Sequence, residues 1–527
     1  MALKFNGNFI EKNMAHSLEL LKAVQLLQKG QHDLARQALE ILHQKSDSES
    51  CTAVRYLAHI ESLNNHFEKA IALLAQAHID FGPDPKVLTQ LAEYNMKSGD
   101  YDRAIDYANQ SLQLMPNNPV LRLNLASWLS SRLDDPTKIR QIYEDWCHDY
   151  LPHPPPFPPL ILRPLTKGRR LKIGYVSGDL KNHAVRYFIE PYFRHQDRKQ
   201  FEVHAFMTLK PDTISDILRG QVEHWHEVEK LSNDALLEKI QQLGIDVLVD
   251  LSGHTAGQRL EVFAQRAAPV QVTWWGFVQT LGLRQMDYRL TDSLHCPPTT
   301  DAHYTEKLLR MKCFTAYAPP LNSEQLFPSP RKLNGYVTMV SMNHSRKISQ
   351  QALLCWRDIL IQNPTAALLI VSNESTESGA NGLYAERLRA LDMPMTRVAI
   401  SPRLSMLNFM HLASIADFAL DSMPISGGVT TFHSLWMGLP VLTLAPPEPI
   451  ALRSYTANIL RTIGMDECVA NGLNEYVERA SQWIQNPEVL DRLRVQCRPF
   501  LQQSPFMQHA ERVRELEALF TELRGGR

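Results

Sequence analysis

The chain has 527 residues, of which 44% are hydrophobic and 21% charged, and its formal net charge is −1. This near-neutral balance gives no electrostatic basis for binding nucleic acid or an anionic membrane surface. The seven cysteines are scattered without a CxxC pair, so the sequence predicts neither a disulfide framework nor a zinc ribbon. No apolar run approaches the length of a membrane span, and the first residues lack the apolar core of a signal peptide. We therefore expect a cytoplasmic protein of several domains.

The first 150 residues are predicted to form helical hairpins that repeat with a period close to 34 residues. Each unit has a turn residue, followed five positions later by a small residue at which two helices can pack closely. These pairs are Gly30 and Ala35, Asn65 and Ala70, and Gly99 and Ala104. The pattern resembles the tetratricopeptide repeat, whose short arrays usually hold a protein or peptide. The alternative is an unrelated helical bundle with accidental spacing.

A proline-dense connector follows the helical repeats. Residues 151–164 read LPHPPPFPPLILRP, and their prolines remove backbone donors and favour an extended path. We expect residues 151–169 to be a linker between domains.

From residue 170 the sequence predicts an α/β fold, because apolar strand candidates alternate with helices. A second proline-rich segment, residues 318–330, divides it into two similar lobes, residues 170–325 and 326–527. Ligands should bind at the carboxyl ends of their parallel strands. The predicted strands are residues 171–177, 201–206, 245–251 and 270–275, then 337–341, 367–371, 418–420 and 441–444.

The stretch from Ala416 to Leu444, ADFALDSMPISGGVTTFHSLWMGLPVLTL, predicts a strand, a glycine loop, a helix and a second strand. Gly427 and Gly428 precede the helix, and Thr430 and Thr431 lie in its opening turn. Free N–H groups and the positive end of the helix dipole suit a phosphate or diphosphate. An ordinary βαβ unit with a glycine-containing turn is the other reading.

Three further residues are candidates for chemistry because of their positions in loops after strands. His183 follows the first strand and His254 follows a later one, and a neutral imidazole can act as acid, base or hydrogen-bond partner near pH 7. In the second lobe, Lys347 follows a strand and could neutralise a phosphate oxygen. The alternatives are structural or surface histidines and a solvated lysine.

The sequence offers little for other catalytic classes. Its DxD-like triplet, residues 100–102, is predicted to lie in a helical-repeat turn remote from both lobes, so metal binding is not expected. It shows no Ser-His-Asp or G-x-S-x-G arrangement, and no G-x-G-x-x-G opens either lobe.

Five motifs, taken in order, resemble the bacterial O-GlcNAc transferase/SPINDLY family of glycosyltransferases. They are LKIGYVSGDLKNH, DVLVDLSGHTAGQRLEVFAQRAAPVQVTW, MDYRLTD, SMNHSRKIS and LDSMPISGGVTTFHSLWMGLPVLTL, and the resemblance covers residue 170 to about residue 465. It implies a GT-B fold of two Rossmann-like lobes preceded by tetratricopeptide-like repeats. It also implies inverting, metal-independent transfer of a sugar from a nucleotide donor to Ser or Thr hydroxyls of proteins.

The resemblance also implies roles for individual residues. His183 matches an active-site histidine proposed as a base, and Lys347 matches the lysine that contacts the donor diphosphate. Thr430 and Thr431 match a helix-start pair that binds the same diphosphate, and residues 427–428 complete that cradle.

Four departures from the family pattern concern the donor site and its surroundings. His433 stands where the family usually has Asp or Glu in contact with the nucleoside, and His344 stands at a site that is commonly Asn or Gln. Ala184 replaces a proline, and residues 275–281, WGFVQTL, replace a loop that borders the sugar. A carboxylate binds a ribose hydroxyl with two oxygens, whereas an imidazole offers a single nitrogen.

The leading hypothesis from the sequence is a protein O-glycosyltransferase that uses UDP-GlcNAc and needs no cofactor or metal. Alternatives are UDP-glucose or GDP-fucose as donor, an Asn side chain as acceptor, or a non-catalytic scaffold that binds nucleotide sugar. The expected partners are a nucleotide sugar and an acceptor protein held by the repeats, with neither nucleic acid nor membrane.

Overall fold

The computed structural model of the chain describes residues 18–44, 49–153, 169–371 and 382–525. It forms two compact units. Unit 1 comprises residues 1–128, 343–353 and 369–404, and unit 2 comprises residues 129–342, 354–368 and 405–527. Within the described ranges, no helix combines the length and apolar character needed to span a bilayer.

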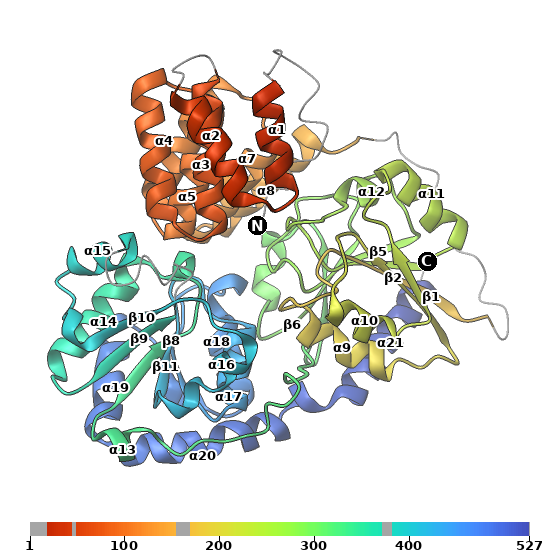
Figure 1. Cartoon of the computed structure of the whole chain (residues 1–527). Coiled ribbons are helices and arrows are strands. Elements are labelled where there is room, and N and C mark those ends of the chain that lie inside the picture. The colour runs from red at the N-terminus through yellow and green to blue at the C-terminus, as the bar shows by residue number, and fades with distance from the viewer. Residues whose placement is uncertain (1–17, 45–48, 154–168, 372–381, 526–527) are drawn as a thin grey trace. The chain divides into compact units, whose positions relative to one another are not determined.

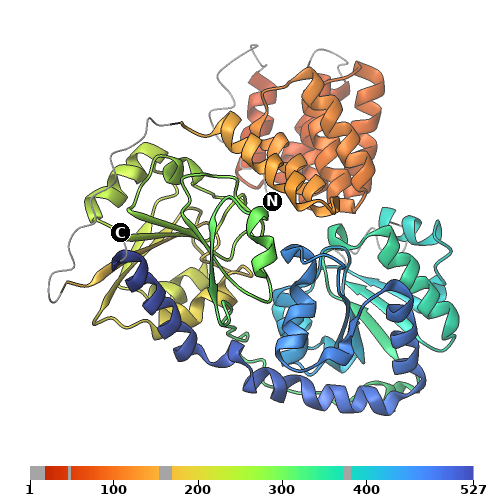
Figure 2. The same cartoon turned by 180° about the vertical axis from the view of Figure 1, so that it is seen from behind.

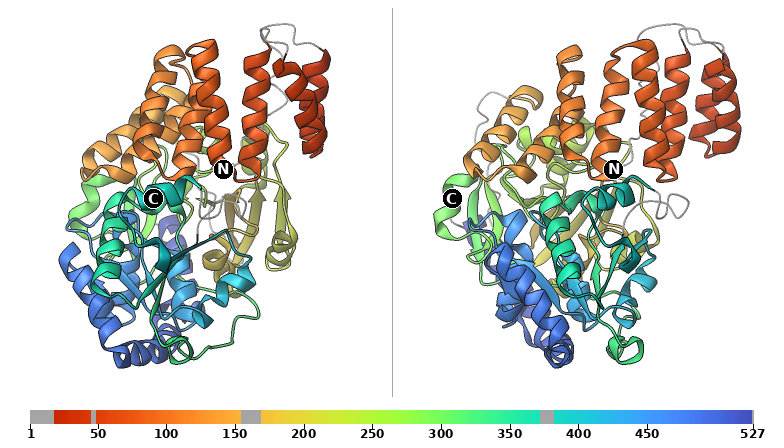
Figure 3. Two further views of the ribbon diagram at one scale, coloured as in Figure 1. Left: turned by 60° about the vertical axis from the view of Figure 1, so that its left-hand side comes forward. Right: turned by 90° about the vertical axis from the view of Figure 1, so that its left-hand side faces the viewer.

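Unit 1 begins with three helical hairpins, coloured red to orange in Figure 1. Their helices are α1 (Leu18–Gln28), α2 (His32–Gln44), α3 (Ser50–Leu63), α4 (Phe67–Phe81), α5 (Pro85–Ser98) and α6 (Tyr101–Leu114). Figure 3 shows them side by side as successive hairpins. The backbone of the turn residues Gly30, Asn65 and Gly99 has a positive φ of 75°, 60° and 88°. The paired alanines at 35, 70 and 104 are fully buried, which confirms the predicted repeat.

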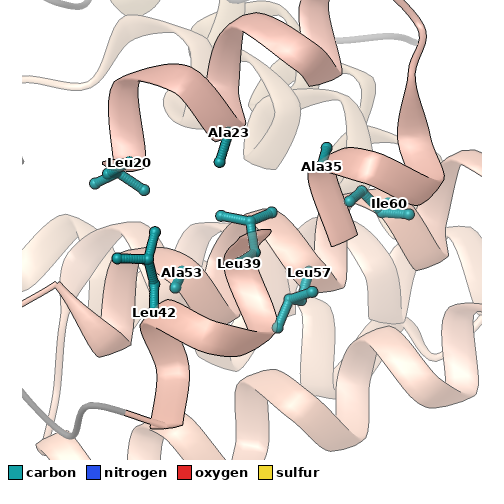
Figure 4. Close-up of a cluster of buried hydrophobic side chains, with 8 residues drawn as sticks. All are labelled: Leu20, Ala23, Ala35, Leu39, Leu42, Ala53, Leu57 and Ile60. Atoms are coloured by element: carbon teal, nitrogen blue, oxygen red, sulfur yellow. The ribbon is translucent and has the colours of Figure 1, made fainter. Parts of the chain in front are cut away.

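The core of the first repeats follows from helical spacing. Apolar residues recur three or four positions apart, so they share one face of each helix. Figure 4 shows the resulting cluster between α1, α2 and α3: Leu20, Ala23, Ala35, Leu39, Leu42, Ala53, Leu57 and Ile60.

A further helix pair follows the three hairpins in the chain. It consists of α7 (Pro119–Arg132) and α8 (Pro136–Tyr150), and α8 belongs to unit 2. Tyr143 and Ser130 donate to the Oε1 atom of Gln279 at 3.3 and 3.1 Å. The Cys147 thiol donates to the Leu281 carbonyl, so α8 and the last residues of α7 pack on a loop of the first lobe within unit 2.

The first lobe contains a parallel seven-stranded sheet in the order β3-β2-β1-β4-β5-β6-β7. Its helices are α9 (Arg186–His195), α10 (Thr213–Arg219), α11 (Asn233–Leu243) and α12 (Leu260–Ala264). The strands are β1 (Leu171–Ser177), β2 (Phe201–Met207), β3 (His224–Glu227), β4 (Val247–Asp250), β5 (Val270–Thr273), β6 (Tyr288–Asp292) and β7 (Lys307–Met311). The parallel sheet and four of its strands confirm the prediction, whereas β3, β6 and β7 were not predicted.

The second lobe contains a six-stranded sheet in the order β10-β9-β8-β11-β12-β13. The strands are β8 (Thr338–Ser341), β9 (Ala367–Val371), β10 (Val398–Ser401), β11 (Phe418–Leu420), β12 (Val441–Leu444) and β13 (Val469–Ala470). The helices are α13 (Arg331–Asn334), α14 (Gln350–Gln362), α15 (Leu383–Arg389), α16 (Met406–Met410), α17 (Val429–Trp436), α18 (Ala451–Thr462) and α19 (Leu473–Gln485). All four strands predicted for this lobe are present.

Two C-terminal helices complete unit 2, α20 (Pro487–Gln503) and α21 (His509–Gly525). In α20, Arg494 donates to the carbonyl of Ala416 at 2.8 Å, just before β11. Figure 2 shows α21, in dark blue, lying against the first lobe. There Glu517 accepts from the amide of Asp197 at 2.6 Å, and Arg524 lies 3.4 Å from Asp246 at the start of β4.

Candidate active site

An aspartate at the end of a central strand shapes the following loop in each lobe. In the first lobe, Asp250 accepts from the amide of Gly253 at 2.9 Å and from the Thr273 hydroxyl of β5 at 2.9 Å. In the second lobe, Asp421 holds the loop between β11 and α17 by equivalent bonds. It accepts from the amide of Gly427 at 2.8 Å and from a β12 hydroxyl, at residue 443, at 2.7 Å. Both loops are therefore fixed at the carboxyl edges of their sheets.

The segment before α17 leaves no room for a side chain at Gly427. A Cβ atom there would lie 2.6 Å from the Oγ1 atom of Thr431 and 2.9 Å from that of Thr430. Gly428 is the N-cap residue of α17 and provides no side chain to cap it. The Thr431 hydroxyl is buried and bonds that of Thr456 at 2.9 Å, while Thr430 is partly exposed. The structure thus brings the predicted cradle residues together at a helix N-terminus, where backbone N–H groups attract anions.

His433 lies on α17 and is buried, with 2% of its surface exposed. Its Nδ1 atom lies 2.8 Å from the Tyr317 hydroxyl, and its Nε2 atom has no hydrogen-bond partner among the described residues. The ring packs edge-on against Tyr187 with centroids 4.7 Å apart. Burial, with a smaller effect of Arg186, lowers the pKa of His433 to about 3. At neutral pH this ring is uncharged, and its Nε2 atom is buried.

Helix α9 follows the His183 loop and packs against α17 through its aromatic side chains. It begins three residues after His183, and its Phe188 ring stacks on Trp275 with centroids 4.2 Å apart. The same ring packs against Phe432 of α17 at 5.6 Å. The amide of Ala318 donates to the backbone carbonyl of Tyr187 at 2.7 Å. Within unit 2, the loop of His183 and the helix of the threonine pair are therefore joined by an aromatic cluster.

The His183 side chain is 45% exposed and lies 3.6 Å from Asp179. Its Nδ1 atom accepts from the amide of Val185 at 3.4 Å. Partial burial lowers the pKa of His183, and the opposing effect of Asp179 does not reverse this. An accessible imidazole that is neutral at pH 7 can accept a proton.

His254 is 7% exposed and has a different environment. Its Nε2 atom donates to the carbonyl of Leu281 at 2.7 Å, and its ring stacks on Tyr143 with centroids 5.0 Å apart. Burial lowers its pKa to about 4. These contacts are suited to holding the loop of residues 275–281, and a catalytic role for His254 stays a prediction.

Lys347 and His344 belong to unit 1, where they lie in and beside the short helix η3 (Ser345–Lys347). His344 caps this helix by accepting from the amide of Arg346 at 3.3 Å, and burial lowers its pKa to about 3. The turn between α5 and α6 packs on the same segment. There Tyr101 donates to the carbonyl of Arg346, so the prediction that residues 100–102 are remote from both lobes is wrong. How Lys347 lies relative to the threonine pair of unit 2 stays a prediction.

The loop of residues 275–281 is tightly built. Trp275 has a positive φ of 43°, and a Cβ atom at Gly276 would lie 1.9 Å from the carbonyl oxygen of Leu251. A pocket within unit 2 adjoins this loop. It is lined by residues that include Trp275, Phe277, Thr291, His295, Phe314 and Tyr455.

Sequence reasoning missed Tyr317, Tyr187 and Asp421 as parts of this site. Tyr317 lies at the edge of a segment read as a linker, and its pairing with a residue 116 positions away is a property of the fold. The role of Asp421 could have been predicted from the sequence. An aspartate ends the central strand of each lobe, in VLVDLSG and in FALDSMP.

Comparison with known proteins agrees with this architecture. The model of glycosyl transferase family 41 matches residues 153–317 and 326–516, and a tetratricopeptide repeat model matches residues 85–118. A mutant O-GlcNAc transferase of Thermobaculum terrenum has a similar structure, with a TM-score of 0.85, 29% identity and 96% of each chain covered. This likeness confirms the GT-B type of fold with helical repeats before it.

Two plant proteins show the similarity in sequence. Both are described as probable UDP-N-acetylglucosamine–peptide N-acetylglucosaminyltransferase SPINDLY. The protein of Solanum lycopersicum is 30% identical over 407 residues, which are 76% of this chain and 43% of that protein. The protein of Arabidopsis thaliana is 31% identical over 404 residues, 73% of this chain and 42% of that protein. The chain thus spans less than half the length of these relatives. Since the family model matches most of both lobes in order, the chain belongs to glycosyl transferase family 41.

Proposed function

We propose that this protein transfers N-acetylglucosamine from UDP-N-acetylglucosamine to Ser or Thr hydroxyls of proteins, with inversion and without a metal or cofactor. The observation that carries the proposal is the glycine–threonine segment at the start of α17, braced by Asp421 and joined to the His183 loop through α9. The solved relative, an O-GlcNAc transferase, and the names of the plant relatives supply the donor and acceptor.

In this proposal, negative charge develops on the donor diphosphate as the glycosidic bond breaks. The N-terminus of α17, Thr430 and the Lys347 ammonium stabilise that charge without a metal. His183, which is accessible and neutral, takes the proton of the acceptor hydroxyl directly or through a water molecule.

We also propose a reducing compartment, the cytoplasm, and an acceptor protein held by the helical repeats. All seven cysteines have free thiols, and six of them are buried, as is usual where thiols stay reduced. Support for the acceptor site comes from the stacked hairpins α1–α6, because such arrays present extended binding surfaces.

The first experiment supplies a panel of labelled nucleotide sugars to the purified protein with a cell lysate, followed by mass spectrometry of the labelled peptides. We expect label from UDP-N-acetylglucosamine on Ser or Thr, reduced about 100-fold or more by Lys347→Ala. The matched control is Lys332→Ala, since Lys332 is an exposed lysine of the same lobe paired with Asp491. Equal transfer by Lys347→Ala would reject the assigned donor site.

A second candidate is supported by His433, which provides one nitrogen where the family usually has a carboxylate. The candidate function is the same transfer with a different donor or acceptor, such as UDP-glucose, GDP-fucose or an Asn side chain. Exclusive use of another sugar in the panel would establish it. A scaffold that binds nucleotide sugar without turnover remains the third reading. Transfer by the parent protein above the level of a His183→Ala, Lys347→Ala double variant would exclude this scaffold function. Absence of transfer by the folded parent protein would favour it.

A further inference from the structure

A cluster of histidines and a glutamate lies at the edge of the seven-stranded sheet, on β2 and β3. Glu202 and His204 are two residues apart on β2, so their side chains project from the same face of the sheet. His204 is the register partner of His224 on β3. Because paired residues of neighbouring strands share a face, the two imidazoles and the carboxylate converge on one patch.

The distances within this cluster match those between the ligands of a metal ion. The Oε1 atom of Glu202 lies 3.1 Å from Nε2 of His204 and 3.3 Å from Nε2 of His224. The three ligand atoms all lie within 4.8 Å of one another. In a tetrahedral zinc site with bonds of about 2.0–2.1 Å, ligand atoms are about 3.3 Å apart.

The surroundings resemble those of a zinc site in two further respects. The side chain of His204 is only 2% exposed, and its other ring nitrogen, Nδ1, lies 3.1 Å from Nε2 of His226. A second partner of this kind fixes the orientation of a metal-binding ring. The side chain of His224 is 43% exposed, so one side of the cluster is open to water.

We propose that Glu202, His204 and His224 bind one zinc ion, with water as the fourth ligand. The site holds the short edge strand β3 to β2 and serves stability. It is separate from the proposed transfer site, because Glu202 is the second residue of β2 whereas His183 and His254 follow the carboxyl ends of β1 and β4. Two His nitrogens and one carboxylate oxygen form a ligand set that zinc accepts.

A lysine competes with the metal for the carboxylate. Lys172 places its Nζ atom 3.3 Å from Oε1 of Glu202, and Arg170 lies 3.3 Å from Oε2. The Lys172 side chain is 29% exposed and can turn toward solvent when the ion binds. Zinc affinity should therefore rise when this ammonium is removed.

The test measures binding of zinc alone to the purified full chain by competition with a chromophoric chelator at pH 7.5. We expect one zinc per chain and a raised unfolding temperature with zinc. Affinity should fall at least 10-fold in Glu202→Gln and in His224→Gln, and rise in Lys172→Met. His303→Gln, at a histidine of a separate short helix, Pro298–His303, is the control and should bind as the parent does.

Absence of zinc binding would overturn the proposal, as would binding of equal affinity in both ligand variants. The two substituted side chains are partly exposed, and circular dichroism verifies that these variants are folded. Transfer activity is not the readout, so failure of the proposed function would leave this result interpretable.

Discussion

A carboxylate at position 433 would carry its charge into a cluster of aromatic rings, and burying an unpaired charge is costly. The histidine found there avoids this cost because its ring is neutral and is bonded to Tyr317. When Tyr317 donates to Nδ1, the ring proton lies on Nε2, a buried donor with no partner among the described residues. A carboxylate would offer only acceptors. The histidine therefore places a neutral donor where a carboxylate would place charged acceptors.

The first prediction concerns the pH dependence of transfer, which should follow the protonation of His183. A general base acts in its neutral form, and burial lowers the pKa of His183 from its ordinary 6.5. The acid limb of kcat/KM should therefore lie below pH 6.5, with activity constant from there to pH 7.5. The pH profile of initial rates measures this. The residual activity of His183→Gln should lack the limb, and an unchanged limb in that variant would contradict the assignment.

The second prediction compares two glycines of the second lobe. Gly427→Ala should weaken donor binding at least 10-fold and cost about 1–3 kcal/mol of stability, because the new methyl group overlaps two threonine hydroxyls. Gly472→Ala is the control, since a Cβ atom at Gly472 meets nothing within 4 Å. Calorimetry with UDP and denaturant unfolding provide the two measurements. Equal behaviour of the two variants would show that the loop tolerates a side chain.

At the scale of elements, the turn between α5 and α6 supports the segment that carries Lys347. Arg387 donates to the carbonyl of Gly99 at 3.0 Å, and Ser345 donates to that of Lys97 at 3.3 Å. The third repeat thus has two roles, because it belongs to the helical array and also shapes the chain beside a predicted donor-binding lysine.

The third prediction tests this support with two glycines that both have a positive φ. Gly30 and Gly99 both have a positive φ, so alanine should cost about 1–2 kcal/mol at either position. A Cβ atom at Gly99 would lie 2.9 Å from Arg387 and 3.4 Å from the carbonyl oxygen of Ser345, whereas at Gly30 nothing lies within 4 Å. We expect the donor KM to rise several-fold in Gly99→Ala alone. Steady-state kinetics measures the donor KM of both variants. An equal rise of the donor KM in Gly30→Ala would contradict a local effect at Gly99.

The elements differed in how far the sequence could predict them. Buried parallel strands such as LKIGYVS were predictable because they are continuous apolar runs. The repeat turns were predictable because each needs a residue that accepts a positive φ. The edge strand β3 reads HWHE and is short and polar, so no pattern indicated it. The glycine loop and helix start at 427–431 were predictable from local sequence. The pairing of His433 with Tyr317 was not, since only the folded chain brings them together.

At the scale of the whole molecule, buried neutral histidines make stability depend on pH. The pKa of His254 is lowered to about 4 and that of His433 to about 3. Between those values and 6.5 the unfolded chain binds more protons than the folded one, so stability rises with pH in this window. Above pH 6.5 this contribution is constant.

The fourth prediction is that stability falls as the pH is lowered through this window. Lowering the pH from 6.5 to 5 should reduce the free energy of unfolding by up to about 1.4 kcal/mol per pH unit for each of these histidines. Urea unfolding at several pH values measures the slope. His254→Gln removes one titrating group and should give a shallower slope, and an identical slope would show that the buried ring does not contribute.

The C-terminal helix α21 packs on the first lobe, and this packing determines where the chain can be cut or exchanged. Because Glu517 and Arg524 contact Asp197 and Asp246, the first lobe is built from segments at both ends of unit 2. A fragment cut at residue 325 would expose the surface that α21 covers. A chimera that exchanges the second lobe, which carries the predicted donor-binding residues, should therefore leave α21 in place with residues 170–325.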